Sequence, residues 1–224
     1  MRDQNLLEWN ERQKDLRLAL NQVKDLENIR SLFLIQHGSL HSSQVAEDLG
    51  WHYEDEIWHA LDENLFRRIP VKQEHSIAWI FWHLTRIEDM TMAALVAGEE
   101  QLFDRDNWQA RMRVPFRDTG NAMSMQSITE LSALLDMSVL RDYRVKVGKQ
   151  TQSILNGLQL PDFQQKTDSK RITHLLDQGD IQAEAAWLAE YWGGLTVAGL
   201  LLMPPTRHIL VHLNEAARLK LKKV

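Results

Sequence analysis

The chain contains no cysteine, and it has only five prolines and ten glycines among its 224 residues. The absence of cysteine excludes disulfide bonds, thiolate zinc sites, iron–sulfur clusters and a cysteine nucleophile. The low proline and glycine counts disfavour an all-β chain, which needs many turns, and favour long helices. An excess of positive charge is also missing, because 26 lysines and arginines face 31 aspartates and glutamates, a net charge of −5. The sequence therefore gives no support for nucleic-acid binding.

Long hydrophobic runs are absent as well. The longest mostly apolar stretch, residues 195–203, is about nine residues long, whereas a membrane-spanning helix needs about 20. The first residues, MRDQN, lack the basic-then-apolar pattern of a signal peptide. We therefore expect a cytoplasmic protein without membrane association.

The composition that is present is ordinary for a globular protein, with 44% hydrophobic and 25% charged residues. Apolar side chains recur at three- and four-residue spacing, which is typical of amphipathic helices. Long helices are predicted over residues 10–37, 74–97, 127–158 and 204–220, and shorter ones over 53–67 and 182–203.

Several local signals set the expected ends of these helices. Ser127 and Glu130 match a capping box at the start of the third long helix. Gly98 follows the second long helix as a C-terminal cap, and residues 99–126 are expected to be irregular. Four long helices with shorter inserts indicate an all-α four-helix bundle, which we expect to form a single domain over residues 1–224.

Binding sites in such bundles are built from inward-facing side chains on facing helices. Nine histidines are present, and His208 and His212 are four residues apart in the last predicted helix. Their directions differ by about 40° and their heights by about 6 Å, so both imidazoles can reach one ion. His37 and His41 form a second such pair, although Gly38 interrupts its helical geometry. In a chain with nine histidines, a single pair of this kind also arises by chance.

His83 lies on the apolar stripe of the helix predicted over residues 74–97. An imidazole buried without a partner costs a few kcal/mol, so it needs a partner of some kind. That partner is either one hydrogen bond inside the core or a divalent ion shared with His208 and His212.

Two segments resemble the DinB/YfiT-like metalloenzyme superfamily. Residues 75–89, HSIAWIFWHLTRIED, are similar to its second bundle helix, in which Trp or Leu precedes a histidine and an acidic residue follows. Residues 204–215, PPTRHILVHLNE, are similar to its fourth helix with a terminal pair of histidines. The segments 99–126 and 160–203 exceed the compact family core and leave the shape of the pocket open.

The resemblance implies a four-helix bundle that binds one divalent metal ion through His83, His208 and His212. It also implies a homodimer and a small-molecule substrate. Several relatives are transferases or isomerases that use a low-molecular-weight thiol, so such a thiol is an implied cofactor. Three neutral imidazoles leave the ion its full charge and an open position, which can activate water or hold a thiolate. Imidazole ligands do not distinguish zinc, nickel and iron.

A general base is harder to assign. Glu215 shares the stripe of His208 and His212 and is either a ligand, a partner of a ligand, a base, or part of a surface salt bridge. Glu88 and Asp89 point away from the direction of His83, so we expect them to pair with arginines or to cap helices. Tyr191 and Trp192 line a pocket mouth or belong to the core.

Two functions remain open at this point. One is a metal-dependent enzyme, such as a thiol-dependent transferase or a hydrolase. The other is a non-catalytic stress-response protein for binding or interaction, in which the metal is structural or absent. Three protein ligands plus water beneath an open cleft favour the enzyme. A closed four-ligand shell, or histidines satisfied by carbonyls, favours the second function.

Overall fold

The structure is a computed structural model, and it describes residues 2–70 and 75–222. Within these residues the chain is all-α, and the closest approach to a sheet is one isolated bridge between Lys166 and Thr196. The α-helices are α1 (Arg2–Gln22), α2 (Leu26–Gly38), α3 (Tyr53–Trp58), α4 (Glu63–Arg67), α5 (Ile77–Asp89), α6 (Leu102–Arg105), α7 (Trp108–Met112), α8 (Met125–Leu134), α9 (Met137–Gly157), α10 (Ser169–Asp177), α11 (Trp187–Gly193), α12 (Val197–Leu202) and α13 (Ile209–Leu221). Two π-helical segments, η1 (Met90–Ala97) and η4 (Met203–His208), and two 3₁₀ turns, η2 (Leu160–Gln164) and η3 (Ala183–Ala185), complete the series.

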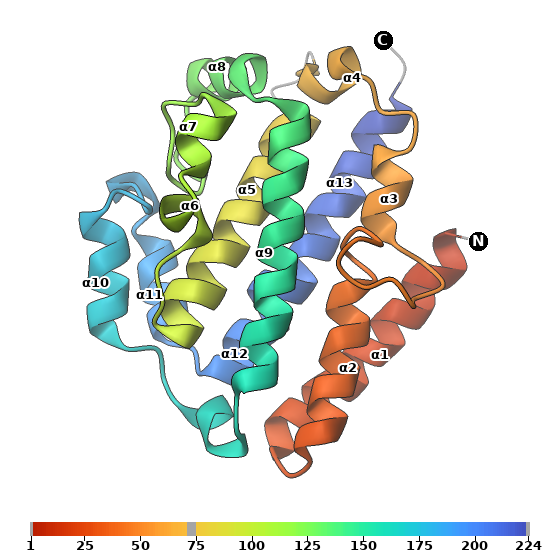
Figure 1. The fold of residues 1–224 in the computed structure, drawn as a ribbon, viewed down its shortest axis with the longest axis vertical. Helices are drawn as coiled ribbons and strands as arrows, with labels where there is room; N and C mark the ends of the chain where they lie inside the picture. The colour runs from red at the N-terminus through yellow and green to blue at the C-terminus, as the bar shows by residue number, and fades with distance from the viewer. Residues whose placement is uncertain (1, 71–74, 223–224) are drawn as a thin grey trace.

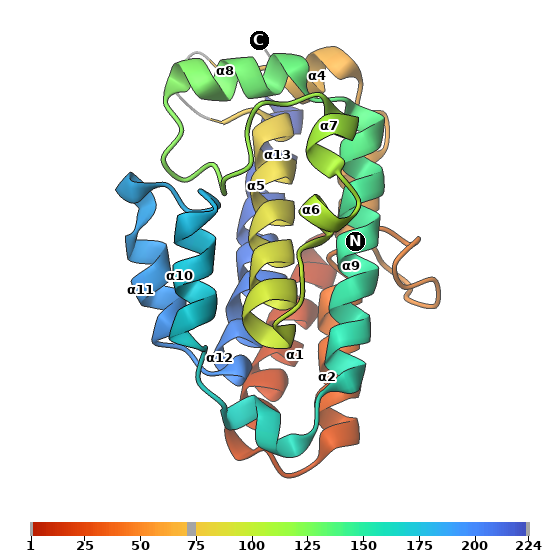
Figure 2. The same cartoon turned by 60° about the vertical axis from the view of Figure 1, so that its left-hand side comes forward.

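The four-helix bundle is confirmed. Its members are α2 with α1 against it, α5 continued by η1, α9, and α13 preceded by α12 and η4 (Figure 1). Helix α5 lies between α9 and α13, and α10 and α11 stand as a pair beside one side of the bundle (Figure 2). All thirteen residues of α5 are buried, which is the pattern of a central helix. None of the helices in the described part of the chain is both long enough and apolar enough to cross a bilayer.

The predicted helix over residues 10–37 is wrong in one respect, because it is two antiparallel helices. Val23 adopts a left-handed conformation with φ 47°, and Asp25 caps α2 by accepting from the Asn28 N–H. Trp9 and Gln36 then bond across the pair: the Trp9 indole donates to the Gln36 carbonyl, and the Gln36 amide donates to the Trp9 carbonyl. The break lets the chain bury two apolar stripes against each other.

Two further predicted helices are also interrupted. Residues 53–67 form α3 and α4, because Ala60 is left-handed with φ 53° and Asp62 caps a new start. Residues 127–158 divide into α8 and α9 at Asp136, which accepts from two backbone N–H groups of α9. The cap of α8 is Ser124, not the predicted Ser127, and it accepts from the Ser127 N–H. In each case a short Asp or Ser side chain satisfies N–H groups that a continuous helix would use internally.

The second long helix begins at Ile77, and the predicted start at Glu74 lies outside the described residues. Gly98 ends it in the left-handed conformation with φ 71°, as predicted. The irregular stretch 99–126 contains the short helices α6 and α7.

The last helix does not begin at Pro204, because α12, η4 and α13 follow one another without a loop. Pro205 has no N–H to give to the Leu201 carbonyl, and the Thr206 hydroxyl donates to that carbonyl instead, at 3.0 Å. The Gln13 amide donates to the Leu202 carbonyl at 3.4 Å. These side chains satisfy carbonyls at the proline pair, so the segment stays helical with a π turn that ends at His208.

A buried arginine ties the side pair of helices to the bundle. Asp180, between α10 and α11, accepts from the guanidinium groups of Arg86 on α5 and of Arg117, at 3.1 and 3.0 Å. The Gln101 amide donates to its other oxygen. Because Arg86 and Asp180 are fully buried, these bonds fix where α11 stands relative to α5.

A second buried arginine, Arg144 on α9, joins three elements. Its guanidinium bonds to Glu54 at 3.1 Å and to Glu88 at 2.7 Å, and all three side chains are fully buried. Charged groups in the interior need such complete pairing, because the loss of one partner leaves an uncompensated charge.

Replacing this arginine tests the network. We expect Arg144→Ala to lower the free energy of unfolding by about 3–5 kcal/mol, because Glu88 and Glu54 lose their cation inside the protein. Arg141→Ala, on the same helix but with a partly exposed side chain paired with Asp55, should cost about 1 kcal/mol or less. Urea unfolding followed by circular dichroism measures both, and equal losses would contradict a special role for Arg144.

Candidate metal centre

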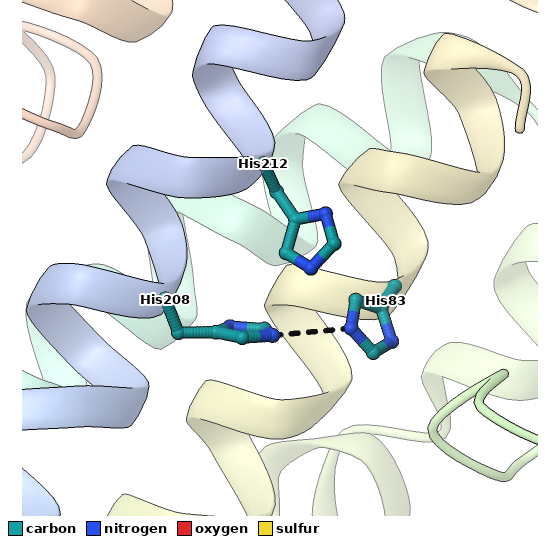
Figure 3. A group of neighbouring side chains, drawn as sticks. All are labelled: His83, His208 and His212. Atoms are coloured by element: carbon teal, nitrogen blue, oxygen red, sulfur yellow. Dashed lines mark hydrogen bonds between the residues drawn. The ribbon is translucent and has the colours of Figure 1, made fainter.

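Three histidines converge between two helices of the bundle. His83 comes from the middle of α5, His208 from the end of η4 and His212 from the first turn of α13 (Figure 3). The Nε2 atoms of His83 and His208 are 3.1 Å apart, and the three ring centroids lie 4.6 to 5.0 Å from one another. Each residue offers one ring nitrogen, and these nitrogens all lie within 4.8 Å of one another.

These distances suit a shared cation. Ligands about 2.0–2.1 Å from a tetrahedral zinc ion lie about 3.3 Å from one another. The separation of the His83 and His208 nitrogens is close to that value. In Figure 3 the rings of His208 and His212 project from one helix towards His83 on the other, so the three donors surround a common point.

A backbone carbonyl orients His83. The Nδ1 atom lies 2.6 Å from the Thr119 carbonyl, which can only accept, so Nδ1 carries the proton and Nε2 keeps its lone pair. Gly120 follows in the left-handed conformation with φ 84°, and a Cβ there would come within 2.8 Å of the Trp79 indole nitrogen. Glycine thus allows the loop to bring Thr119 against α5.

A carboxylate orients His212. Its Nδ1 atom lies 3.1 Å from one oxygen of Glu215, and His75 Nδ1 lies 3.3 Å from the other. Burial raises the pKa of Glu215, but these two hydrogen bonds outweigh it and the pKa falls to about 2. Glu215 is therefore an ionised carboxylate that accepts a hydrogen bond from each histidine. Nδ1 of His212 therefore faces Glu215 and leaves Nε2 to face the other two rings. The buried Nδ1 of His208 has no hydrogen-bond partner among the described residues.

The ring protonation also favours a cation. Burial lowers the pKa of His83 to about 3. Burial, together with the neighbouring His83 and His212, lowers the pKa of His208 well below its ordinary value. Neutral imidazoles at physiological pH are the form that binds metal, so the donor set fits the ion that the sequence implied.

A pocket of about 350 Å³ opens over the histidines. All three line it, together with His75, Trp79 and residues of α11 and η4. The Trp79 ring stacks on His75 at 3.6 Å and on His83 at 4.6 Å between centroids, and this stacking holds the three rings in place along one side of the pocket. A larger hollow of about 720 Å³ beside α9 and α10 shares none of its lining residues with this pocket.

Bundle proteins build binding sites from side chains on facing helices, and this all-α bundle brings three histidines together there beneath a pocket. A family model of the DinB superfamily matches residues 48–203, and the chain belongs to this superfamily. The matched segment includes His83 but ends before His208 and His212, so the convergence of the three rests on the structure. The sequence has no match among curated proteins.

The other residues singled out from the sequence have distinct positions. Glu215 lies behind His212, bonded to two histidines, and is not among the residues that line the pocket. Glu88 and Asp89 pair with Arg144 and Arg86, and Asp89 also accepts from the backbone N–H groups that start α6, as expected.

The predicted alternatives for the two aromatics on α11 both occur. Tyr191 lines the pocket with 43% of its surface exposed, and Trp192 is a core residue that also reaches the pocket. The roles of His75 and Thr119 were missed. The spacing of His75 to Trp79 and His83, four and eight residues, was a signal for His75, whereas a backbone carbonyl from a distant loop leaves no sequence signal.

His37 and His41 also come together, with Glu88, in a fully buried cluster. Glu88 lies 2.7 Å from His37 Nε2 and 3.1 Å from His41 Nε2. The guanidinium of Arg144 lies 2.7 Å from Glu88 and 3.2 Å from His41 Nε2. Because this guanidinium already supplies the positive charge and the Thr151 hydroxyl donates to Glu88, we interpret the cluster as an ion-pair network and not as a metal centre.

The network makes stability depend on pH. Burial, with a further contribution from Arg144, lowers the pKa of His41 to about 3. The unfolded chain binds a proton at His41 near pH 6.5 and the folded chain does not, so this histidine weakens the fold as pH falls from about 6.5 towards 3.

We expect the free energy of unfolding of chelator-treated protein to fall with pH below about 6, and His41→Gln to remove a slope of about 1.4 kcal/mol per pH unit. Urea unfolding at pH 6.0, 5.5 and 5.0 measures the slope for both proteins. An unchanged slope in the variant would show that His41 is protonated in the folded state.

Proposed function

We propose that this protein is a metal-dependent enzyme whose divalent ion is held by His83, His208 and His212. The observation that carries the proposal is that three converging imidazoles line one open pocket. No fourth His, Cys, Asp or Glu of the described residues joins this group. An open position beside three protein ligands is typical of catalytic metal sites, whereas structural sites are closed by four.

Each residue of the site has a separate task. Thr119 and Glu215 hold the outer nitrogens of His83 and His212, so their inner nitrogens stay available. Trp79 packs against His83 and excludes water from that side. When bound, a divalent ion lowers the pKa of a water or thiol ligand towards neutrality.

The substrate is proposed to be a small molecule, because the pocket of about 350 Å³ is at the lower end of the range for ligand sites. A low-molecular-weight thiol is the co-substrate that family membership suggests. Zinc, nickel and iron all suit imidazole ligands, so the metal is identified by analysis of untagged protein from its native host.

Metal analysis tests the centre directly. We expect about one divalent ion per chain, and loss of that ion in His83→Ala, His208→Ala and His212→Ala, because two imidazoles alone bind weakly. His174→Ala, an exposed histidine on α10, is the matched control and should keep the metal. Stoichiometric metal in all three site variants would refute the proposal.

Glu215 provides a second test. We expect Glu215→Ala to weaken metal binding by about 10- to 100-fold, because His212 loses the carboxylate that orients it. His75→Ala removes the other partner of Glu215 and leaves the His212 bond in place, so it should bind metal nearly as tightly as the native protein. Competition with a chromophoric chelator gives the affinities, and equal affinities for Glu215→Ala and native protein would remove Glu215 from the site.

A further inference from the structure

One side of the pocket over the histidines is formed by Trp187 and Tyr191, here called the aromatic wall, which a three-histidine metal site does not require. Trp187 and Tyr191 lie four residues apart on α11, on one face of the helix, and both line the pocket. Their exposed fractions are 56% and 43%, although large aromatic side chains are usually well buried. Two exposed rings beside a hollow are typical of a surface that a ligand covers.

The lack of charged side chains in the pocket lining restricts the class of ligand further. Among the residues that the structure describes, those lining this pocket include no Lys, Arg, Asp or Glu. Its polar groups are four imidazoles, three indole N–H groups, the Asn121 amide and the Tyr191 hydroxyl. An anionic ligand group placed away from the histidines would find no cation there, and its desolvation would oppose binding.

The location of the wall ties it to the histidines. Asp180, seven residues before Trp187, bonds to buried Arg86, so the chain that leads into α11 is anchored to the helix that carries His83. The volume of about 350 Å³ corresponds to about 12 water molecules at roughly 30 Å³ each. A molecule of one or two rings fits this space.

We propose that the pocket binds a flat, uncharged aromatic molecule, with its ring against Trp187 and Tyr191 and one donor atom at the histidine-bound metal. The inference rests on the proposed metal centre and adds the class of substrate. It assigns the segment between α10 and α12, which exceeds the core of the bundle, the role of selecting that substrate.

Cobalt-loaded full-length protein provides the test, because the visible spectrum of cobalt changes when a new ligand binds. Three probes share one neutral donor: imidazole, 4-phenylimidazole and 4-(imidazol-4-yl)benzoate. We expect 4-phenylimidazole to bind about tenfold more tightly than imidazole, because its ring is buried against the wall. The benzoate should lose this gain, since its carboxylate has no cationic partner.

Substitutions at Trp187 test whether the aromatic wall causes the tighter binding of 4-phenylimidazole. Trp187→Ala should bind 4-phenylimidazole several-fold more weakly and imidazole unchanged, and Trp187→Phe should retain most of the preference. Leu18→Ala, which removes an equally exposed apolar side chain on α1, is the control and should behave as the native protein. Cobalt stoichiometry and circular dichroism establish that each variant is folded and loaded.

The outcomes separate the two proposals. If cobalt binds but 4-phenylimidazole shows no advantage, or the benzoate binds most tightly, the aromatic substrate class is wrong and the metal centre stands. If native protein binds no cobalt at the three histidines, the metal centre fails and the inference falls with it.

Discussion

The positions of the protons on three imidazoles constrain everything else at this site. The Thr119 carbonyl accepts a hydrogen bond from Nδ1 of His83, and Glu215 accepts one from Nδ1 of His212, so the Nε2 atoms of both rings are left to face the site. Burial lowers the pKa of His83 and of His208 and keeps both rings neutral. Ring nitrogens whose lone pairs face one another repel by themselves and are stabilised around a cation, which supports the proposed metal centre.

The buried ion pairs of the interior hold the helices in fixed positions relative to one another. Arg144 joins α9 to Glu54 and Glu88, and Arg86 joins α5 to Asp180 ahead of α11. Charged pairs of this kind add little net stability compared with apolar packing, but they tolerate few alternative arrangements. In this protein they join α9 to α3 and α5, and α5 to the segment that leads into α11.

Much of the fold follows from local sequence patterns, because apolar spacing of three and four residues dictates helices and the scarcity of glycine and proline leaves few places to stop. The sequence-based prediction was wrong where it joined two helices into one. Val23, Ala60 and Asp136 divide helices that periodicity joins, since a short cap or a left-handed residue competes with one more helical turn for a small free energy. The π turn at Pro204 and Pro205 depends on Thr206 and Gln13, and Gln13 is distant in sequence.

The sequence by itself determined an all-α bundle, a metal-ligand chemistry without thiolates because cysteine is absent, and the proximity of His208 and His212, which are one helical turn apart. Only the tertiary structure decided that His83 meets that pair, that Thr119 and Glu215 orient the rings, that His37 and His41 join an arginine network instead, and that α11 supplies an aromatic wall. The physical reason is that helical periodicity fixes the neighbours of a residue within about one turn, whereas contacts between distant segments depend on how buried side chains pack and pair.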